Sequence, residues 1–437
     1  MCADLGHRRA HSELLVRTVG VALIAVMLGA ALPARAQDDE EEDATSVATT
    51  ALILPEGGAT DGDAARVSIG VRRGLGEVSG VRFIHPVDVL SPPDISEDLA
   101  FSFDELEPLA DQVRTGDARD VADRASTLIE LFEQNLLAVR REQLIDAYML
   151  RGVALCRLNR MRDAEVVFAR VIVFREGYEY DPTRYPVECA ETFASVQERT
   201  LAGPRATLEI STEPDGAEIY VDGRSYGPSP VVVDDLLVGD HYVTIKHIAS
   251  IKGVERATVN RGGSSVRYAL APNERSALVA SGEATSALRG ELGEERAGSA
   301  IRSLGNTLGA AQVVVGVARR VGESLHVQLY LYDVRTRFLL NRAEINMTSD
   351  DAGVEIARSA AVELYRGVDL TGAIDAPIDE SGLPTTRPPE VWEQWWFWTA
   401  IGAGAVAIGV GVGVGVAVSE SSSGPPEGWV RFGTTFR

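Results

Sequence analysis

The chain has 437 residues, which is long enough for two to four domains. Its formal net charge of −22 at pH 7 argues against the basic surface on which nucleic acids and anionic membranes bind. We therefore expect several folded domains and no nucleic-acid partner. The predicted fold class is multidomain α+β, with mixed α/β segments flanking a helical region and a small all-β domain.

The first 36 residues are organised like a secretory signal peptide. Arg8, Arg9 and Arg17 make the start positive, and Val19 to Leu32 is uncharged and mostly apolar. Ala34-Arg35-Ala36 then places small residues at both positions that a signal peptidase recognises. Because the apolar run is too short to span a bilayer comfortably, we expect residues 1–36 to be removed on export.

Two segments are predicted to carry no regular structure. Residues 37–50 include six consecutive acids, Asp38 to Asp43, and are expected to be a solvated, disordered stretch. Residues 371–394 form a linker rich in proline, which lacks the amide proton that helices and sheets need.

The 24 residues from Trp395 to Val418 contain no charge. As a helix they would extend about 36 Å at roughly 1.5 Å per residue, enough to cross a bilayer. Tryptophans crowd one end of this stretch, where indole rings lie at the headgroup level. The alternative is a buried strand, since Gly409 to Val416 alternates, but the uncharged stretch far exceeds a strand of about 5–6 residues. We predict a transmembrane helix over 395–418.

This arrangement predicts a single-pass protein of the bacterial inner membrane, with its main body in the periplasm and residues 419–437 as a cytoplasmic tail. Glycines four apart, Gly409 with Gly413 and Gly411 with Gly415, let two such helices approach closely. The same spacing also arises by composition in Gly-rich helices. A homodimer and a monomer are therefore both left open.

Residues 99–203 are predicted to be helical throughout. Tyr148-x-x-Arg151-Gly152-x-x-Leu155 is followed by Ala164-x-x-x-Phe168. The small residues would let two antiparallel helices approach, with Phe168 filling the wedge between them. This pattern resembles a tetratricopeptide unit, although Arg151 stands where leucine is usual. A lone unit cannot bury its apolar face, so neighbouring helices must cover it; a generic helical bundle is the alternative.

Residues 204–272 are predicted to be all β, with turn signals about every 8–12 residues. Ala217, Ile219 and Val221 alternate inward before Asp222-Gly223, a strong hairpin signal. The run from Ser211 to Gly223, Ser-x-x-Pro-x-Gly-Ala-x-Ile-x-Val-Asp-Gly, resembles the PEGA domain, with aspartate in place of the family's glutamate. The resemblance implies a small exported module, similar to a β-sandwich and usually without catalytic function.

Residues 51–98 and 273–370 carry mixed α and β patterns. The first segment offers a strand, a helix and the strand Val81–Val89, and the second offers helix Gly298–Leu308, three strands and helix Ala352–Arg366. This order resembles the N-terminal domain of TolB and related envelope assembly proteins, with Gly309 to Gly316 as a loose match to its Gly-Ala-x-x-Val-Val-Gly pattern. It implies that the segments are halves of one five-stranded mixed domain. Two independent small units are the alternative, because sequential elements usually pack together.

Two cysteines, Cys156 and Cys189, remain after removal of the signal peptide. The predicted compartment permits disulfides. Free cysteine is nevertheless among the most buried residue types. We therefore predict two separate buried thiols, with a bridge as the alternative.

No sequence motif carries chemistry. His241 and His247 share a face of one predicted strand but lie about 20 Å apart, too far for one metal ion. Gly74-x-Gly76 follows a helix rather than a strand, which excludes a dinucleotide-binding turn. We predict no catalytic, cofactor-binding or metal-binding residue, and no cofactor.

Two function classes compete. The first is a non-enzymatic, membrane-anchored periplasmic scaffold or assembly protein whose modules bind other envelope proteins. The second is a membrane-tethered cell-wall or carbohydrate-binding module that uses an aromatic face of the β domain. Strand alternation splits the aromatic residues of that domain between both faces, which favours the scaffold. They are Tyr220, Tyr226, Tyr242 and Tyr268.

Overall fold

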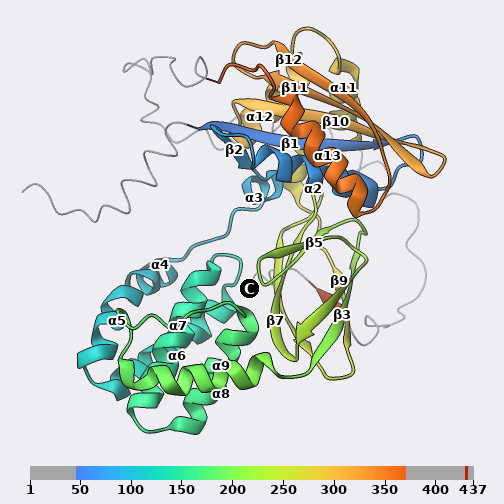
Figure 1. Ribbon diagram of the computed structural model, residues 1–437. Helices are drawn as coiled ribbons and strands as arrows, with labels where there is room; N and C mark the ends of the chain where they lie inside the picture. Colours follow the sequence, from blue (N-terminus) through green and yellow to red (C-terminus); the bar gives the residue numbers. More distant parts are fainter. Residues whose placement is uncertain (1–45, 371–428, 432–437) are drawn as a thin grey trace, which may run out of the picture. The chain divides into compact units, whose positions relative to one another are not determined.

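The computed structural model describes residues 46–370 and 429–431, and the chain there is mixed α/β with three sheets (Figure 1). The predicted signal peptide, the acidic run and the linker lie outside the described residues. No helix among the described residues is long and apolar enough to cross a membrane. The predicted transmembrane helix, Trp395–Val418, also lies outside them.

The first sheet joins two segments that are far apart in the sequence. Its strand order is β12-β11-β10-β1-β2, in which β1 pairs in parallel with both β10 and β2. The other three strands form an antiparallel meander. We call this sheet and its helices the α/β domain. The strands are β1 (Val47–Glu56), β2 (Val81–Ile84), β10 (Gln312–Val321), β11 (Ser324–Asp333) and β12 (Leu339–Met347).

Both faces of this sheet are covered, which explains the apolar run at its centre. Ala51 and Ile53 of β1 face a core formed with α2 (Asp61–Leu75) and α13 (Asp351–Leu364). Leu52 and Leu54 face the opposite core. Side chains alternate along a strand, so a strand covered on both faces reads as continuously hydrophobic. The second core is closed by α3 (Pro86–Leu90), α10 (Ala277–Ala280), α11 (Gly282–Glu291) and α12 (Ser299–Leu308).

Glycines allow the two helices on the first face to pack closely. A Cβ atom at Gly70 would lie 2.5 Å from the carbonyl oxygen of Val354, and one at Gly74 would lie 2.2 Å from that of Arg358. Both distances are shorter than the non-bonded contacts that Cβ atoms make in proteins. Gly74, which belongs to no nucleotide-binding turn, therefore serves the contact between α2 and α13.

The second part of the chain, here called the helical module, is a stack of helices. Gly152 and Phe168 meet between α7 and α8, where a Cβ atom at Gly152 would lie 2.5 Å from the phenylalanine ring. Phe168 is fully buried in a core shared by all six helices. The helices are α4 (Glu97–Asp104), α5 (Leu106–Thr115), α6 (Ala118–Gln134), α7 (Arg141–Arg157), α8 (Met161–Phe174) and α9 (Ala190–Leu201).

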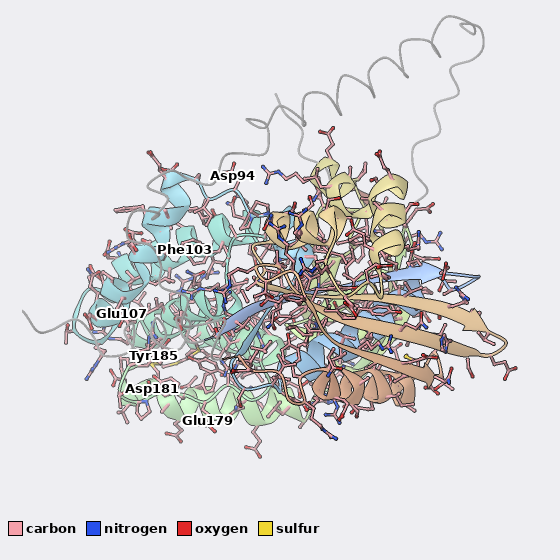
Figure 2. All side chains as sticks on the ribbon, turned by 90° about the horizontal axis from the view of Figure 1, so that it is seen from above. Asp94, Phe103, Glu107, Glu179, Asp181 and Tyr185 are labelled. Carbon is pink, nitrogen blue, oxygen red and sulfur yellow. A yellow bond between two sulfur atoms is a disulfide. The ribbon has the colours of Figure 1, made fainter. Side chains whose placement is uncertain are left out.

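The prediction of two separate thiols is wrong, because Cys156 and Cys189 form a disulfide. Cys156 lies at the end of α7, and Cys189 lies in the short 3-10 helix just before α9. The chain reaches Cys189 through the loop that carries Asp181 and Tyr185, which are labelled in Figure 2. Tyr185 is buried in the core and anchors this loop. A bridge over a separation of 33 residues contributes about 3–4 kcal/mol by limiting the unfolded chain.

The third part, here called the β module, has two four-stranded sheets around one core. Their orders are β13-β9-β3-β6 and β5-β4-β7-β8. The predicted alternation holds, since Ala217, Ile219 and Val221 are buried in this core. The strands are β3 (Arg205–Glu213), β4 (Glu218–Val221), β5 (Arg224–Pro228), β6 (Val231–Leu237), β7 (Gly239–Lys246), β8 (Gly253–Val259), β9 (Ser264–Ala269) and β13 (Trp429–Arg431).

Two elements differ from the predicted ones. The first strand begins at Val47, so residues 47–50 belong to β1 rather than to the acidic segment. The predicted strand Val81–Val89 ends at Ile84, and α3 begins at Pro86. His85 caps this helix, because its Nδ1 accepts a hydrogen bond from the amide of Val87 over 3.2 Å. Proline at the first helical position favours the same turn.

Candidate functional site at the two junctions of the β module

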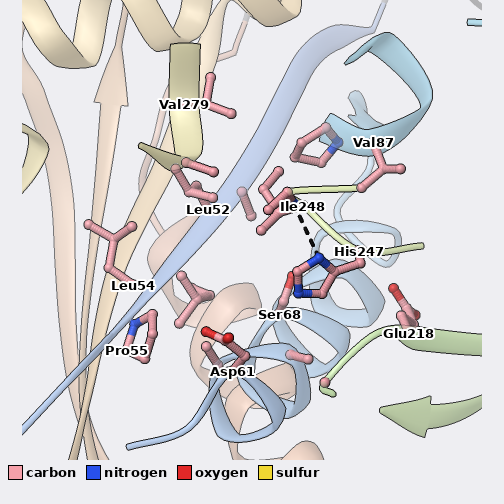
Figure 3. Close-up of a pocket in the computed structure, with 18 of the residues that line it drawn as sticks. Leu52, Leu54, Pro55, Asp61, Ser68, Val87, Glu218, His247, Ile248 and Val279 are labelled. Atoms are coloured by element: carbon pink, nitrogen blue, oxygen red, sulfur yellow. Dashed lines mark hydrogen bonds between the residues drawn. The ribbon is translucent and has the colours of Figure 1, made fainter. Parts of the chain in front are cut away.

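A cavity of about 320 Å³ lies where the α/β domain meets the β module (Figure 3). Leu52 and Leu54 of β1 and Val279 of α10 supply apolar walls. His247 and Glu218 come from the β module. Polar and apolar groups thus converge between two parts of the chain, as in many ligand pockets.

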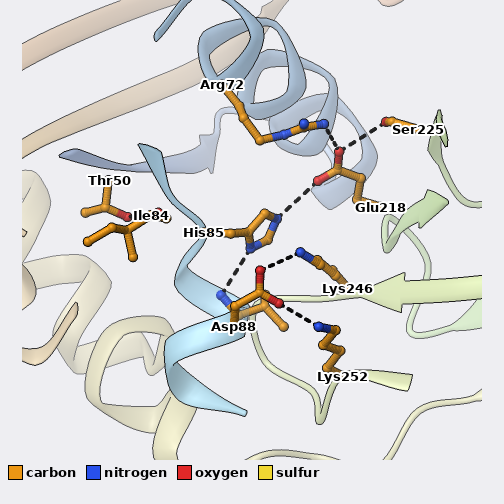
Figure 4. A network of polar contacts seen from close by, with 10 residues as sticks. Thr50, Arg72, Ile84, His85, Asp88, Glu218, Ser225, Lys246 and Lys252 are labelled. Carbon is orange, nitrogen blue, oxygen red and sulfur yellow. Dashed lines mark hydrogen bonds and ion pairs between the residues drawn. The ribbon is translucent and has the colours of Figure 1, made fainter. Parts of the chain in front are cut away.

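Glu218 is the centre of a buried polar network beside this cavity (Figure 4). Arg72 of α2 donates to its Oε1 atom, and the Nε2 atom of His85 lies 3.2 Å from its Oε2 atom. The hydroxyl of Ser225 also donates to Oε1 over 3.2 Å. The Glu218 side chain is only 9% exposed. Arg72 and His85 of the α/β domain thus supply the partners that a buried carboxylate of the β module needs.

The network determines the protonation states of its members. Burial alone would raise the pKa of Glu218, but the hydrogen bond from His85 and the charge of Arg72 outweigh it and lower that pKa to about 2. Burial lowers the pKa of His85, which favours the neutral imidazole. Since Nδ1 of His85 accepts from the amide of Val87, the proton of the neutral ring is on Nε2 and is donated to Glu218.

Asp88 of α3 holds a second contact between the same two parts. The Nζ atom of Lys246 lies 2.6 Å from its Oδ2 atom, and that of Lys252 lies 2.9 Å from its Oδ1 atom. These are the only two lysines in the chain. Burial lowers the pKa of Lys246, partly offset by the charge of Asp88.

Tyr220 links the two ion-pair groups. Its ring centroid lies 5.5 Å from the guanidinium carbon of Arg72 and 5.3 Å from the Nζ atom of Lys246. Cations over an aromatic ring are attracted by its electron-rich face. The ring therefore contacts one cation that binds Glu218 and another that binds Asp88.

The cavity contains serine, histidine and aspartate side chains, but they are not connected as a catalytic triad. The Nδ1 atom of His247 accepts a hydrogen bond from the amide of Ala249 over 3.3 Å, so it does not donate to Asp61. No hydrogen bond joins Ser68 to His247 within residues 46–370 and 429–431. A triad needs both of these bonds. Ser68, His247 and Asp61 are therefore not arranged as a catalytic triad.

The cavity also offers an arginine. Arg289 of α11 donates from Nη2 to the carbonyl oxygen of Pro55 over 2.9 Å, and its Nε atom is buried without a partner. No group of His, Cys, Asp and Glu residues within the described ranges could hold a metal ion. Arg289 therefore adds a positive charge and a buried hydrogen-bond donor to the lining of the cavity.

A second junction connects the β module to the helical module, and Tyr242 is its centre. This side chain of β7 belongs to the core of the helical module and lies 4.7 Å from Phe174, measured between ring centroids. Its hydroxyl donates to Oε1 of Glu133 over 3.1 Å. Arg170 lies 3.2 Å from Oε1 of Glu133 and 3.0 Å from Oδ2 of Asp240, so one guanidinium bridges the two modules.

The hairpin at Asp222-Gly223 of the β module contributes to this second junction. Asp222 accepts a hydrogen bond from the amide of Tyr242 over 2.9 Å, and its other oxygen lies 2.6 Å from Nδ1 of His241. The Nε2 atom of His241 faces the carbonyl oxygen of Leu237 at 2.7 Å. Burial alone would lower the pKa of His241, but Asp222 outweighs it and raises that pKa. Two acceptors suit an imidazolium that donates from both nitrogens.

Two glycines of the run from Ser211 to Gly223 lie at these junctions with positive φ angles. Gly216 has φ +85°, and a Cβ atom there would lie 2.7 Å from the backbone nitrogen of Gly62 at the start of α2. Gly223 has φ +81°, and a Cβ atom there would lie 3.6 Å from Arg141 of α7. Both turns therefore face neighbouring parts of the chain.

Residues 205–248 match the family model of the PEGA domain. No curated protein matches the chain. The matched residues run from β3 through β7 and include Glu218 and Lys246 of the first junction. They also include Asp222 and Tyr242 of the second. The PEGA domain of this chain thus supplies the groups that connect it to both neighbours.

The buried carboxylate predicts a defined pH dependence. The pKa of Glu218 is depressed to about 2 from an ordinary 4.5, so its charge stabilises the fold above pH 4.5 and this contribution is lost as the pH falls towards 2. We expect Glu218→Gln to lower the free energy of unfolding by about 3 kcal/mol at pH 7 and by little at pH 2.5. Urea denaturation across this range measures the difference, with Glu213→Gln as an exposed control. Equal losses at both pH values would contradict the assigned role.

Gly216 should be more sensitive than a glycine that shares only its backbone conformation. Gly216→Ala adds both the cost of a positive φ and a clash with α2, whereas Gly227, at φ +110°, has nothing within 4 Å of an added Cβ atom. We expect Gly216→Ala to lower the melting temperature clearly more than Gly227→Ala. Equal shifts in thermal unfolding would show that the contact with α2 contributes nothing.

Proposed function

We propose that the chain is a non-enzymatic scaffold or assembly protein of the bacterial cell envelope, with its main body in the periplasm and an anchor at Trp395–Val418. The observation that carries this proposal is the use of the PEGA domain as an internal connector. Its buried charges bind the α/β domain, and Tyr242 enters the core of the helical module. The disulfide Cys156–Cys189 supports an oxidising compartment.

The helical module is the part we propose to bind partners. Val166 of α8 is 71% exposed and lines a groove with residues of α9. Arg199 and Glu165 form an ion pair of 3.2 Å along the same groove. We place the docking surface here because an apolar centre at Val166 is flanked by charges, the arrangement of core and rim in protein interfaces. The close α7–α8 contact at Gly152 supports the resemblance of this hairpin to a tetratricopeptide unit.

The α/β domain supports the envelope assignment through its element order. Strand, helix and strand come first. After the two inserted modules follow the helices α10, α11 and α12, then the three-stranded meander and the last helix α13. This is the order on which the resemblance to the TolB N-terminal domain rests. Fold similarity alone identifies no partner, so the resemblance supports an assembly role and not a particular complex.

The glycan-binding alternative requires aromatic rings that are free to stack on sugars. Tyr242 and Tyr268 are buried, and Tyr220 lies against Arg72 and Lys246. Tyr226 is half-buried beside Arg224. The four tyrosines of the β module thus form no common exposed face, which favours the scaffold.

Site-specific crosslinking tests the scaffold against the glycan binder. With a photoreactive residue at Val166, we expect a covalent adduct with another envelope protein in intact cells. The same residue at Asp123, exposed on α6, serves as the control position and should give none. Purified protein should not sediment with isolated sacculi. Sedimentation with sacculi in the absence of any Val166 adduct would reject the scaffold in favour of the glycan-binding module.

The proposed topology conflicts with one pairing in the structure. β13 pairs in parallel with β9, with Trp429 opposite Arg267 and Arg431 opposite Ala269. A strand pairs with a sheet of its own chain only when both lie on the same side of a membrane. A single span over 395–418 would place them on opposite sides. We nevertheless propose a membrane span at Trp395–Val418, because this uncharged stretch is long enough to cross a bilayer.

Protease protection decides between the two arrangements. With an epitope after Arg437, protease added to spheroplasts should digest the body and leave a small C-terminal fragment that keeps the epitope. Permeabilised cells are the control, in which the epitope is also lost. Loss of the epitope from intact spheroplasts would place the tail on the same side of the membrane as the main body and refute the single-pass topology.

A further inference from the structure

β12 is an edge strand, because within the described ranges it pairs only with β11 (Figure 1). The start of its outer edge is covered. There the amide of Leu339 donates to the carbonyl oxygen of Glu295 over 3.0 Å, and the amide of Ala297 donates to that of Arg337 over 2.8 Å. From residue 340 to residue 347 no described strand pairs with this edge.

The backbone of β12 presents hydrogen-bonding groups along this edge. The amide of Arg342 donates to the side-chain Oδ1 of Asn341 over 2.9 Å, and not to a strand. Amides alternate along a strand, so those of Glu344 and Asn346 point to the same side as that of Arg342. A row of such groups is a template on which another strand can pair.

The charges of β12 are self-complementary in one direction only. Arg342 and Glu344 are exposed on the same face, on either side of Ala343. Arg342 forms no ion pair within residues 46–370 and 429–431, and Glu344 is 65% exposed, with His326 at 3.3 Å. In an antiparallel pair centred on Ala343, each arginine lies opposite the glutamate of the other strand. Parallel pairing in register would place like charges together, which destabilises a sheet.

Helix α13 adds apolar surface beside this edge. Val354, Ala357 and Arg358 face α2, as their contacts with the glycines of that helix show. At 3.6 residues per turn, Ile356 projects from the flank of α13 that is turned away from α2. It is 41% exposed. A partner that extends the sheet past β12 would cover this side chain as well.

We propose that a second copy of this chain docks on β12, by antiparallel pairing about Ala343 from Leu340 to Asn346. The two sheets then form one continuous sheet, with Arg342 of each copy opposite Glu344 of the other. The covered segment at residues 337–339 ends the pairing on either side. This surface is distinct from the groove of α8 and α9, so the proposal does not depend on the scaffold function.

Charge reversal tests the pairing in the full-length protein. Arg342→Glu and Glu344→Arg each place like charges opposite one another at two symmetric positions. We expect either variant to weaken the dimer at least about tenfold by sedimentation, and the double exchange to restore it to within about threefold of the parent. Arg366→Glu is the matched control, since this arginine is 78% exposed on the segment after α13 and lies outside β12.

At concentrations where parent and variants are all monomeric, their melting temperatures should agree, because both side chains of the pair are exposed. If neither single charge reversal weakens the dimer, a surface other than β12 joins the two copies, and the proposal would be wrong. A double exchange that fails to recover the dimer would also overturn it. A parent that stays monomeric would refute it too, and would identify Arg342 and Glu344 as charges that protect an edge strand from pairing.

Discussion

The parallel pairing of β1 with β10 is the contact on which the rest of the structure depends. It runs from Thr49 beside Gln312 to Glu56 beside Arg319. The last two side chains form an ion pair of 2.7 Å although they are 263 residues apart. Neither segment has enough apolar surface to bury this sheet alone, since α2 and α13 must pack together over one face. Closing so long a loop costs little more than closing a short one, because the entropy grows with the logarithm of its length.

The inserted modules leave and rejoin the α/β domain at one place. The side-chain amide of Asn273 donates to the carbonyl oxygen of Leu90 over 3.0 Å and to the hydroxyl of Ser91 over 2.8 Å. The chain leaves the domain at Leu90 and returns at Asn273, so these bonds close the insertion at its base. The ion pairs of Asp88 and Glu218 also join the α/β domain to the β module. Charge pairs thus connect the inserted β module to the domain from which it emerges.

Local patterns in the sequence predicted helices and strands well where buried residues recur at a regular spacing. The meander from Gln312 to Met347 has its predicted strands, because alternation with one buried face is visible residue by residue. His85-Pro86 was misread, since a capping side chain and a helix-starting proline resemble a strand end. The disulfide was missed because spacing does not show which loop returns Cys189 to α7. The role of Tyr242 at the junction was not predicted, because the sequence places it only in an alternating strand and its partner Phe174 belongs to another module.

The junction residues show why composition is a weak guide to individual side chains. Of 42 lysines and arginines, only Lys246 and Lys252 are lysines, and both contact the two oxygens of Asp88. A carboxylate binds one guanidinium with both oxygens, whereas two ammonium groups can share it as compact point charges. Two arginines can also share one carboxylate in this chain, since Arg170 and Arg256 contact the two oxygens of Glu133. Both lysines of the chain nevertheless lie on Asp88, at the contact between the α/β domain and the PEGA domain, and this position could not be predicted from composition.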